Sequence, residues 1–166
     1  MSIVMQSWKK RLAVVIVMSL LLATAQLSVL NKASASTNLI LGCCVWASSG
    51  ANPINTVDGV QNTFWQSADA TGWITADLGS EKAVNQIVIK APAYGYWVQG
   101  VKISTSNSTD DGSFVTQSNA TYGFYSANGY TNTINLPATV NTRYVRVQVT
   151  AVSTWTAIGS LEIYGP

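Results

Sequence analysis

Aromatic residues gather in three segments of the second half of the chain, each among small or amide-bearing residues. Tyr94, Tyr96 and Trp97 fall in one segment, Tyr125 in a second and Trp155 in a third. The apolar face of a pyranose stacks on an aromatic ring, and side-chain amides and Tyr hydroxyls bind sugar hydroxyls. These five residues are therefore predicted to bind a neutral sugar. The alternative is that such rings close the ends of a hydrophobic core.

Groups that would support catalysis are scarce. The chain has no histidine, which excludes a Ser-His or Cys-His nucleophile pair and a histidine-ligated metal. Asp110 and Asp111 stand before Gly112, where they are expected to shape a turn, and Asp69 is isolated. A glycosidase needs two carboxylates across a cleft, and the sequence nominates no such pair. We therefore expect no enzymatic activity. A weak hydrolase is the alternative, which an activity screen would expose.

The two cysteines, Cys43 and Cys44, are adjacent. A disulfide between neighbours closes only a strained ring, and the side chains of adjacent strand residues point to opposite faces. Free thiols are therefore expected at least as readily as a disulfide. Pairing between two molecules is a further alternative.

The first 35 residues have the pattern of a secretory signal peptide. Basic residues at 9–11 precede an apolar run at 12–22, and small residues follow at Ala33-Ser34-Ala35. Cleavage after Ala35 would release residues 36–166 as one secreted domain. The alternative is a retained membrane anchor, since the run from Leu12 to Leu30 is nearly as long as the roughly 20 residues of a transmembrane helix.

Removing the leader reverses the sign of the net charge. The full chain carries nine basic and seven acidic residues, a net charge of +2. Four of the basic residues lie in the leader, so residues 36–166 have five basic and seven acidic residues, a net charge of −2. Such a domain is not expected to bind nucleic acid or an anionic membrane surface. The expected partner is a glycan or polysaccharide.

Short β-branched and aromatic runs separated by turn residues fill the sequence after residue 35. The expected strands include residues 72–78, 84–90, 98–105, 131–136, 143–149 and 161–164. Gly79 and Pro137 are expected to end the strands that precede them. In the strand at 143–149, the Tyr and Val side chains are expected on one face and the Arg and Gln side chains on the other. The pattern predicts an all-β sandwich or barrel.

Six groups of short motifs follow one another along the whole of this region. They are Asn38-Leu39-Ile40-Leu41-Gly42 with Ala47-Ser48-Ser49, Val57-Asp58-Gly59 with Thr63-Phe64-Trp65, Trp73 with Asp77-Leu78-Gly79, the run 84–89, Arg143-Tyr144-Val145-Arg146-Val147, and Leu161-Glu162-Ile163-Tyr164-Gly165. Together they resemble the discoidin, or factor V/VIII type C, family, with the closest look to bacterial family 32 carbohydrate-binding modules. The resemblance implies an eight-stranded jelly-roll β-sandwich of the galactose-binding-domain-like type, with ligand loops at one end. It also implies that Trp65 and Trp73 pack in the core.

The resemblance further implies a structural calcium site. The expected ligands are the side chains of Asp58, Thr63 and Glu162 and the backbone carbonyls of Asn55, Val60, Thr63 and Leu161. Calcium takes roughly 6–8 oxygen ligands, often a mixture of carboxylates and carbonyls. The alternative is that Asp58 caps the turn before Gly59 and that Glu162 pairs with a nearby Lys or Arg.

One departure from the family bears on the choice of sugar. Galactose- and fucose-binding relatives commonly use a loop His and Arg, whereas this chain has no His, and Arg143 and Arg146 fall in a strand. The resemblance therefore does not extend to galactose or fucose specificity, and an aromatic site could favour a flatter, equatorial sugar or a polysaccharide chain. The expected function is that of a secreted, non-catalytic carbohydrate-binding module. The alternative is an extracellular adhesion or surface-assembly protein that uses the same loops on a protein or cell-wall partner.

Overall fold

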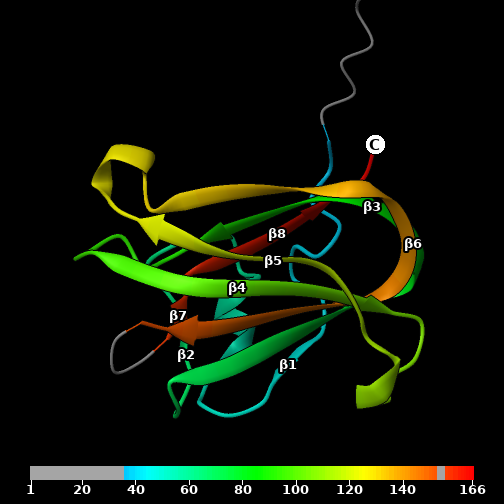
Figure 1. Cartoon of the computed structure of the whole chain (residues 1–166), viewed down its shortest axis with the longest axis horizontal. Helices are drawn as coiled ribbons and strands as arrows, with labels where there is room; N and C mark the ends of the chain where they lie inside the picture. The colour runs from blue at the N-terminus through cyan, green and yellow to red at the C-terminus, as the bar shows by residue number, and fades with distance from the viewer. Residues whose placement is uncertain (1–35, 153–155) are drawn as a thin grey trace, which may run out of the picture. The chain divides into compact units, whose positions relative to one another are not determined.

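The computed structural model describes residues 36–152 and 156–166, so the leader and Trp155 lie outside the described residues. The strands are β1 (Val45–Ala47), β2 (Trp65–Gln66), β3 (Thr71–Lys90), β4 (Trp97–Ser106), β5 (Val115–Phe124), β6 (Thr131–Ala151), β7 (Ala157–Ile158) and β8 (Ser160–Tyr164). Three short 3-10 helices join them: η1 (Pro53–Thr56), η2 (Asp111–Ser113) and η3 (Ser126–Asn128). The predicted all-β sandwich is confirmed (Figure 1). Over the described ranges, no helix is long and apolar enough to cross a membrane.

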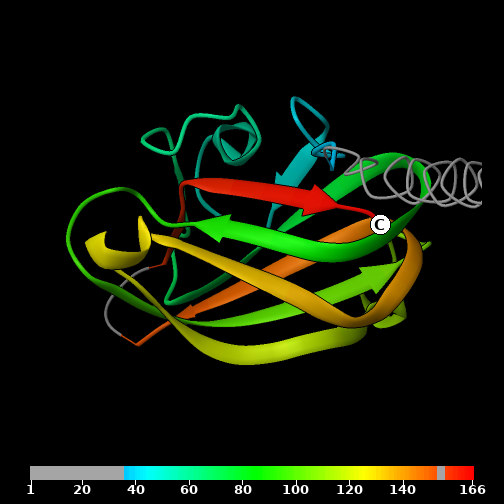
Figure 2. The ribbon, with the colours of Figure 1, turned by 90° about the horizontal axis from the view of Figure 1, so that it is seen from above.

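Two long strands, β3 and β6, bend and take part in both layers of the sandwich (Figures 1 and 2). In one layer the strand order is β1-β3-β6-β4-β5, and residues 71–77 of β3 pair with residues 144–150 of β6. In the other layer, residues 86–90 of β3 pair with residues 131–135 of β6 and with β8. A separate two-stranded sheet joins β2 to β7. All of these pairings are antiparallel.

The two long strands bend where their pairing is interrupted. Residues 78–81 of β3 and residues 136–139 of β6 fall in the gaps of the register. Gly79 lies in the first gap with a φ of 77°, and Pro137 lies in the second, where its missing N–H costs no ladder bond. The predicted strand ends at Gly79 and Pro137 are therefore bends within continuous strands. A positive-φ glycine or a proline is found both in turns that end a strand and in bulges that bend one, so the residue type alone does not distinguish the two.

Aliphatic side chains that alternate along the strands fill the space between the layers. β6 contributes Val145, Val147 and Val149, each of which is fully buried. The expected grouping of Tyr144 with these valines is wrong. Because side chains alternate along a strand, Tyr144 lies on the outer face, where its ring meets Trp46 edge-on with ring centres 6.0 Å apart.

The two tryptophans that the resemblance assigned to the core have different surroundings. Trp65 is fully buried, and its indole Nε1 donates to the Ser49 carbonyl at 2.8 Å. Trp73 is only half-buried, and the Arg146 guanidinium lies 4.1 Å from its ring centre and 3.9 Å from that of Phe114. Trp73 therefore packs against Arg146 rather than within the core.

The adjacent cysteines are both free thiols in this structure. The Cys43 thiol donates to the Leu39 carbonyl at 3.6 Å and packs against the core, whereas Cys44 is exposed. The two side chains thus have different surroundings, just before β1 begins at Val45.

Candidate functional site

Four aromatic residues lie at the end of the β4–β5 ladder that Trp97 and Phe124 form. Trp97 opens β4 and Phe124 closes β5, and the two are cross-strand partners. Both are buried, with exposed fractions of 9% and 0%. The next residues beyond the ladder, Tyr96 and Tyr125, are 70% and 40% exposed. We refer to Trp97 and Phe124 as the inner pair and to Tyr96 and Tyr125 as the outer pair.

The rings of the outer pair stack on each other. Their centres are 5.8 Å apart and their planes differ by 13°. The Tyr125 ring lies over Gly123, because a Cβ atom added at Gly123 would come within 2.9 Å of Cε1 of that ring. A glycine inside a strand can signal such a close approach, and the sequence reasoning had not used it.

Tyr94 forms a second group of rings with Phe64 and Trp97. It is 47% exposed and meets Phe64 and Trp97 edge-on, with ring centres 6.2 Å and 5.7 Å away. Trp97 also donates its indole N–H to the Tyr94 carbonyl at 2.7 Å. Trp97, which was predicted to bind ligand, is thus mostly buried, and it holds Tyr94 through the ring contact and this hydrogen bond. Phe64 was not among the predicted site residues.

Neutral backbone hydrogen bonds join the two loops that carry these tyrosines and close the second loop on itself. The Ala91 N–H donates to the Tyr130 carbonyl at 2.9 Å, and the Tyr130 N–H donates to the Tyr125 carbonyl at 3.0 Å. Gln61 donates to both loops, as described below. Neither residues 91–96 nor residues 125–130 include an Asp, Glu, Lys or Arg. The site therefore offers rings, hydroxyls and backbone groups rather than charge.

Trp155, the fifth predicted ligand residue, lies outside the described residues. The chain on either side of it is bound to β4. The Val152 N–H donates to the Val98 carbonyl at 3.3 Å. The buried Gln99 side chain both donates to the Ala157 carbonyl, at 3.1 Å, and accepts from the Ala157 N–H, at 3.2 Å. Gln99 thus satisfies both backbone groups of Ala157 inside the sandwich.

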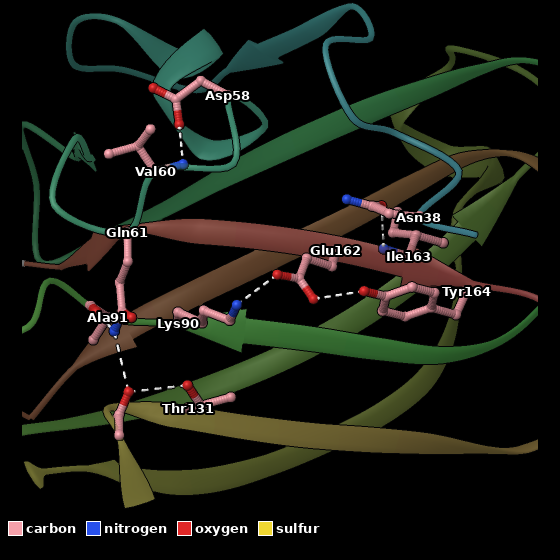
Figure 3. A network of polar contacts seen from close by, with 11 residues as sticks. Asn38, Asp58, Val60, Gln61, Lys90, Ala91, Thr131, Glu162, Ile163 and Tyr164 are labelled. Atoms are coloured by element: carbon pink, nitrogen blue, oxygen red, sulfur yellow. Dashed lines mark hydrogen bonds and ion pairs between the residues drawn. The ribbon is translucent and has the colours of Figure 1, made fainter. Parts of the chain in front are cut away.

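Among the predicted metal ligands, Asp58, Val60 and Thr63 come together in one loop, of which Figure 3 shows Asp58 and Val60. Asp58 Oδ1 accepts from the Val60 N–H at 2.8 Å, which is the expected turn cap. Thr63 Oγ1 lies 2.6 Å from Asp58 Oδ2 and 2.8 Å from the Val60 carbonyl oxygen. A hydroxyl has a single proton to donate, so it cannot satisfy both acceptors at once. This gathering of oxygens suits a hard cation such as calcium.

Glu162 lies in a separate network. Its Oε1 is 2.6 Å from Lys90 Nζ and its Oε2 accepts from the Tyr164 hydroxyl at 2.7 Å (Figure 3). Burial raises the pKa of Glu162, but the hydrogen bonds from Lys90 and Tyr164 together outweigh it and hold the pKa below its usual value. The same hydrogen bond to Glu162 raises the pKa of Tyr164 to about 12.

The predicted metal ligands thus fit calcium in part. The Asp58 loop supplies suitable oxygens, whereas both carboxylate oxygens of Glu162 already have partners, one of them a cation. Asn55 uses its side-chain amide to bind the Phe64 carbonyl at 3.2 Å, and Leu161 is buried in β8 opposite Ile89. Across residues 36–152 and 156–166, no three His, Cys, Asp or Glu residues lie together as a metal-binding group.

The F5/8 type C domain model matches residues 32–163 of the sequence. The chain therefore belongs to the F5/8 type C domain family, as the resemblance indicated. Curated protein sequences yielded no match to the chain.

Similar solved structures include several carbohydrate-binding modules. One is chitosan-binding module 1 of a chitosanase/glucanase from Paenibacillus sp. IK-5, with 27% sequence identity and a TM-score of 0.65, covering 78% of this chain and 99% of that one. Another is the family 32 module of AlyQ in complex with 4,5-unsaturated mannuronic acid, with 26% identity and a TM-score of 0.61, covering 74% and 95%. The family 32 module of C. perfringens NanJ in complex with galactose shares the fold at 16% identity, with a TM-score of 0.65, covering 78% and 98%.

Proposed function

We propose that this chain is a secreted, non-catalytic carbohydrate-binding module that holds a glycan on the exposed rings of Tyr94, Tyr96 and Tyr125, with Trp155 as a further ring. The observation that carries the proposal is the outer pair, whose rings are exposed and stacked on each other, with the Tyr125 ring lying over Gly123. Aromatic rings held in place before the ligand arrives bind at a lower entropic cost.

The relatives support the proposal without naming the sugar. Two modules more than 25% identical to this chain are described by a polysaccharide, chitosan, and by an unsaturated uronic acid. The aromatic loops described above contain no charged residue, which favours a neutral glycan for this chain. The absence of histidine from the whole sequence supports a role without catalysis, since it removes the commonest general acid and base.

Export is the second element of the proposal, and it rests on the leader. Basic, apolar and small residues follow one another in the order of a signal peptide. N-terminal sequencing of the protein from the culture medium of an expressing cell is expected to begin at Ser36. A membrane-bound product that retains Met1 would instead identify the leader as an anchor.

Retention on glycans tests the binding site. The wild-type chain is first screened on an array of purified glycans. The affinities of Tyr96→Ala, Tyr125→Ala and Trp155→Ala are then measured for the glycan that the wild type binds. Each substitution is expected to weaken binding at least about fivefold, since a ring contact contributes about 1 kcal/mol. Val115→Ala is the control, because Val115 is 63% exposed at the opposite end of β5.

Two outcomes would count against the proposal. Unchanged retention in the Tyr96 and Tyr125 variants would remove the outer pair as the platform. Failure of the wild-type chain to bind any purified glycan, together with binding to a protein or cell-wall fraction, would favour the alternative of an adhesion or surface-assembly protein that uses the same loops.

We also propose that the Asp58 loop binds calcium through Asp58, Thr63 and the Val60 carbonyl, with the carbonyls of Asn55 and Leu161 as the remaining predicted ligands. Calcium would supply no chemistry to a sugar and would stabilise the folded state, because it binds that state preferentially.

Excess calcium is expected to raise the melting temperature by about 3 °C or more relative to chelator. Asp58→Ala should abolish this difference and Glu162→Gln should retain it. An unchanged wild-type melting temperature would contradict calcium binding, and loss of the effect in Glu162→Gln would show that Glu162 leaves Lys90 to bind the ion.

A further inference from the structure

Gln61 belongs to the loop that contains Asp58 and Thr63, yet its side chain binds two other loops. Its Nε2 donates to the Ala91 carbonyl at 2.9 Å and to the Gly129 carbonyl at 3.2 Å (Figure 3). A side-chain amide has two N–H donors, so this geometry uses both of them. The Gly129 carbonyl also accepts from the Thr131 hydroxyl at 3.0 Å.

The two loops that Gln61 joins each carry one ring of the outer pair. Ala91 begins the connection from β3 to β4, which contains Tyr96, and Gly129 ends the turn that begins at Tyr125. The spacing of the two rings therefore depends on how these loops are held together. Besides the backbone hydrogen bond from Ala91 to Tyr130 and the stacked rings themselves, the Gln61 amide adds side-chain hydrogen bonds to both loops.

Gln61 itself is held firmly. A Cβ atom added at Gly159 would come within 2.4 Å of the Gln61 carbonyl oxygen and 3.1 Å of the Ala91 carbonyl carbon. The Gly159 N–H donates to the Lys90 carbonyl at 2.7 Å. The backbones of three segments thus meet around Gly159 with no room for a side chain, and the Gln61 amide extends from a fixed base.

We propose that Gln61 is a positioning residue of the glycan site, which sets the distance between the Tyr96 and Tyr125 loops without contacting the glycan. This inference rests on the proposed function. In structural terms, the amide fastens both loops in the arrangement in which Tyr96 stacks on Tyr125, so the binding surface is ordered before the ligand arrives.

Two substitutions test the role of Gln61. Gln61→Ala removes both donors, and Gln61→Glu keeps the size of the side chain but sets a carboxylate against two carbonyl oxygens. Binding to the glycan retained by the wild type is measured by titration calorimetry, well below the melting temperature of each variant. Affinity is expected to fall about tenfold in both variants. Gln86→Ala is the control, because Gln86 is also half-buried and donates one bond, to Asn135 at 2.9 Å, between the strands β3 and β6.

Hydrogen exchange separates positioning from a general loss of stability. Amides of residues 91–96 and 125–130 are expected to exchange faster in both Gln61 variants, while those of β3, β4 and β6 keep their protection. Folded variants with wild-type affinity, or a reduced affinity accompanied by a uniform loss of protection, would overturn the positioning role. Those results leave glycan binding by the wild type intact, so they differ from a wild type that binds no glycan, which would overturn the proposed function and the role built on it.

Discussion

The inner pair and the outer pair are made of the same kind of side chain, are adjacent in sequence, and have opposite surroundings. Trp97 and Phe124 are 9% and 0% exposed, whereas Tyr96 and Tyr125 are 70% and 40% exposed. The inner pair is the last pair of the ladder between β4 and β5, and the outer pair lies one residue beyond that same end, one residue on each strand's side. The end of the ladder is therefore the boundary between aromatic rings that are packed in the core and aromatic rings that are available to a ligand.

The difference shows that residue type does not decide the role of an aromatic ring in this domain. Side chains of successive strand residues point to opposite faces, so a step of one residue moves a ring from the core to the surface. The hydroxyls of the outer pair suit water or a sugar, while the indole N–H of Trp97 is satisfied internally by the Tyr94 carbonyl.

Truncating the inner pair is expected to have the largest effect on stability. Phe124→Ala should lower the free energy of unfolding by about 3–5 kcal/mol, because a fully buried ring leaves a cavity. Tyr96→Ala should change it by no more than about 0.5 kcal/mol, because its ring is mostly exposed. Urea denaturation of both variants measures the difference. Equal losses in the two variants would erase the distinction between the pairs.

Displacing the outer pair without truncating it is expected to have an intermediate effect. Gly123→Ala places a methyl group 2.9 Å from Cε1 of Tyr125, so the ring must move away from its stacked position. Glycan affinity is expected to fall about fivefold, with a loss of stability of about 1 kcal/mol.

Gly100→Ala is the matched control for this displacement. A Cβ atom there has no neighbour nearer than 3.8 Å, which is an ordinary contact, and Gly100 lies on the adjoining strand β4. Calorimetry on the two alanine variants should give wild-type affinity for Gly100→Ala alone. A similar loss in both would mean that glycine in these strands, rather than the position of the Tyr125 ring, controls binding.

The smallest effect is expected from pH, and it should separate the uncharged aromatic loops from the ion pairs. The pKa of Asp77 is lowered, chiefly by its hydrogen bond from Arg143, and that of Glu162 is lowered as well. Groups whose pKa is lowered by folding stabilise the protein above their unfolded values, about 4, and this contribution is lost as the pH falls through the folded values. The melting temperature should therefore be constant from about pH 8 to pH 5 and decline below about pH 4.5.

Glycan affinity should stay constant over the same neutral range, since the loops carry no carboxylate or basic group. Glu162→Gln should reduce the acid-induced loss by no more than about 1 kcal/mol, as is usual for a partly exposed pair. Thermal melts across pH, with binding measured at pH 5 and pH 8, check both statements. A melting temperature that already falls between pH 8 and pH 6 would contradict the assignment of these two carboxylates.

Much of the fold could be predicted from local patterns. The alternation in residues 143–149 identified a strand whose valines are in the core, although Tyr144 was assigned to the wrong face. Gly79 and Pro137 were recognised as interruptions, yet whether each ended a strand or bent it depended on pairing with distant residues. Bends and ends look alike in sequence because both need a missing donor or a positive φ.

The candidate site was predictable only as a set of residue types. Tyr94, Tyr96 and Tyr125 are exposed together at the ladder's end, but the sequence did not distinguish them from the buried Trp97. The partner of Glu162 was foreseen as an unspecified Lys or Arg. The structure identifies it as Lys90, 72 residues away. Pairing of β3 with β8, which sets Lys90 opposite Ser160, decides this contact.

By itself, the sequence determined that residues 36–166 are mildly acidic, lack histidine, alternate as strands and carry aromatic residues between those strands. These properties depend on residue type and on local spacing alone. The tertiary structure decided which rings face water, which cation neutralises Glu162, and that Gln61 binds the Ala91 and Gly129 carbonyls. Such contacts join residues far apart in the chain, often through backbone atoms that every residue shares. Only the register of the strands and the packing of the loops select among them.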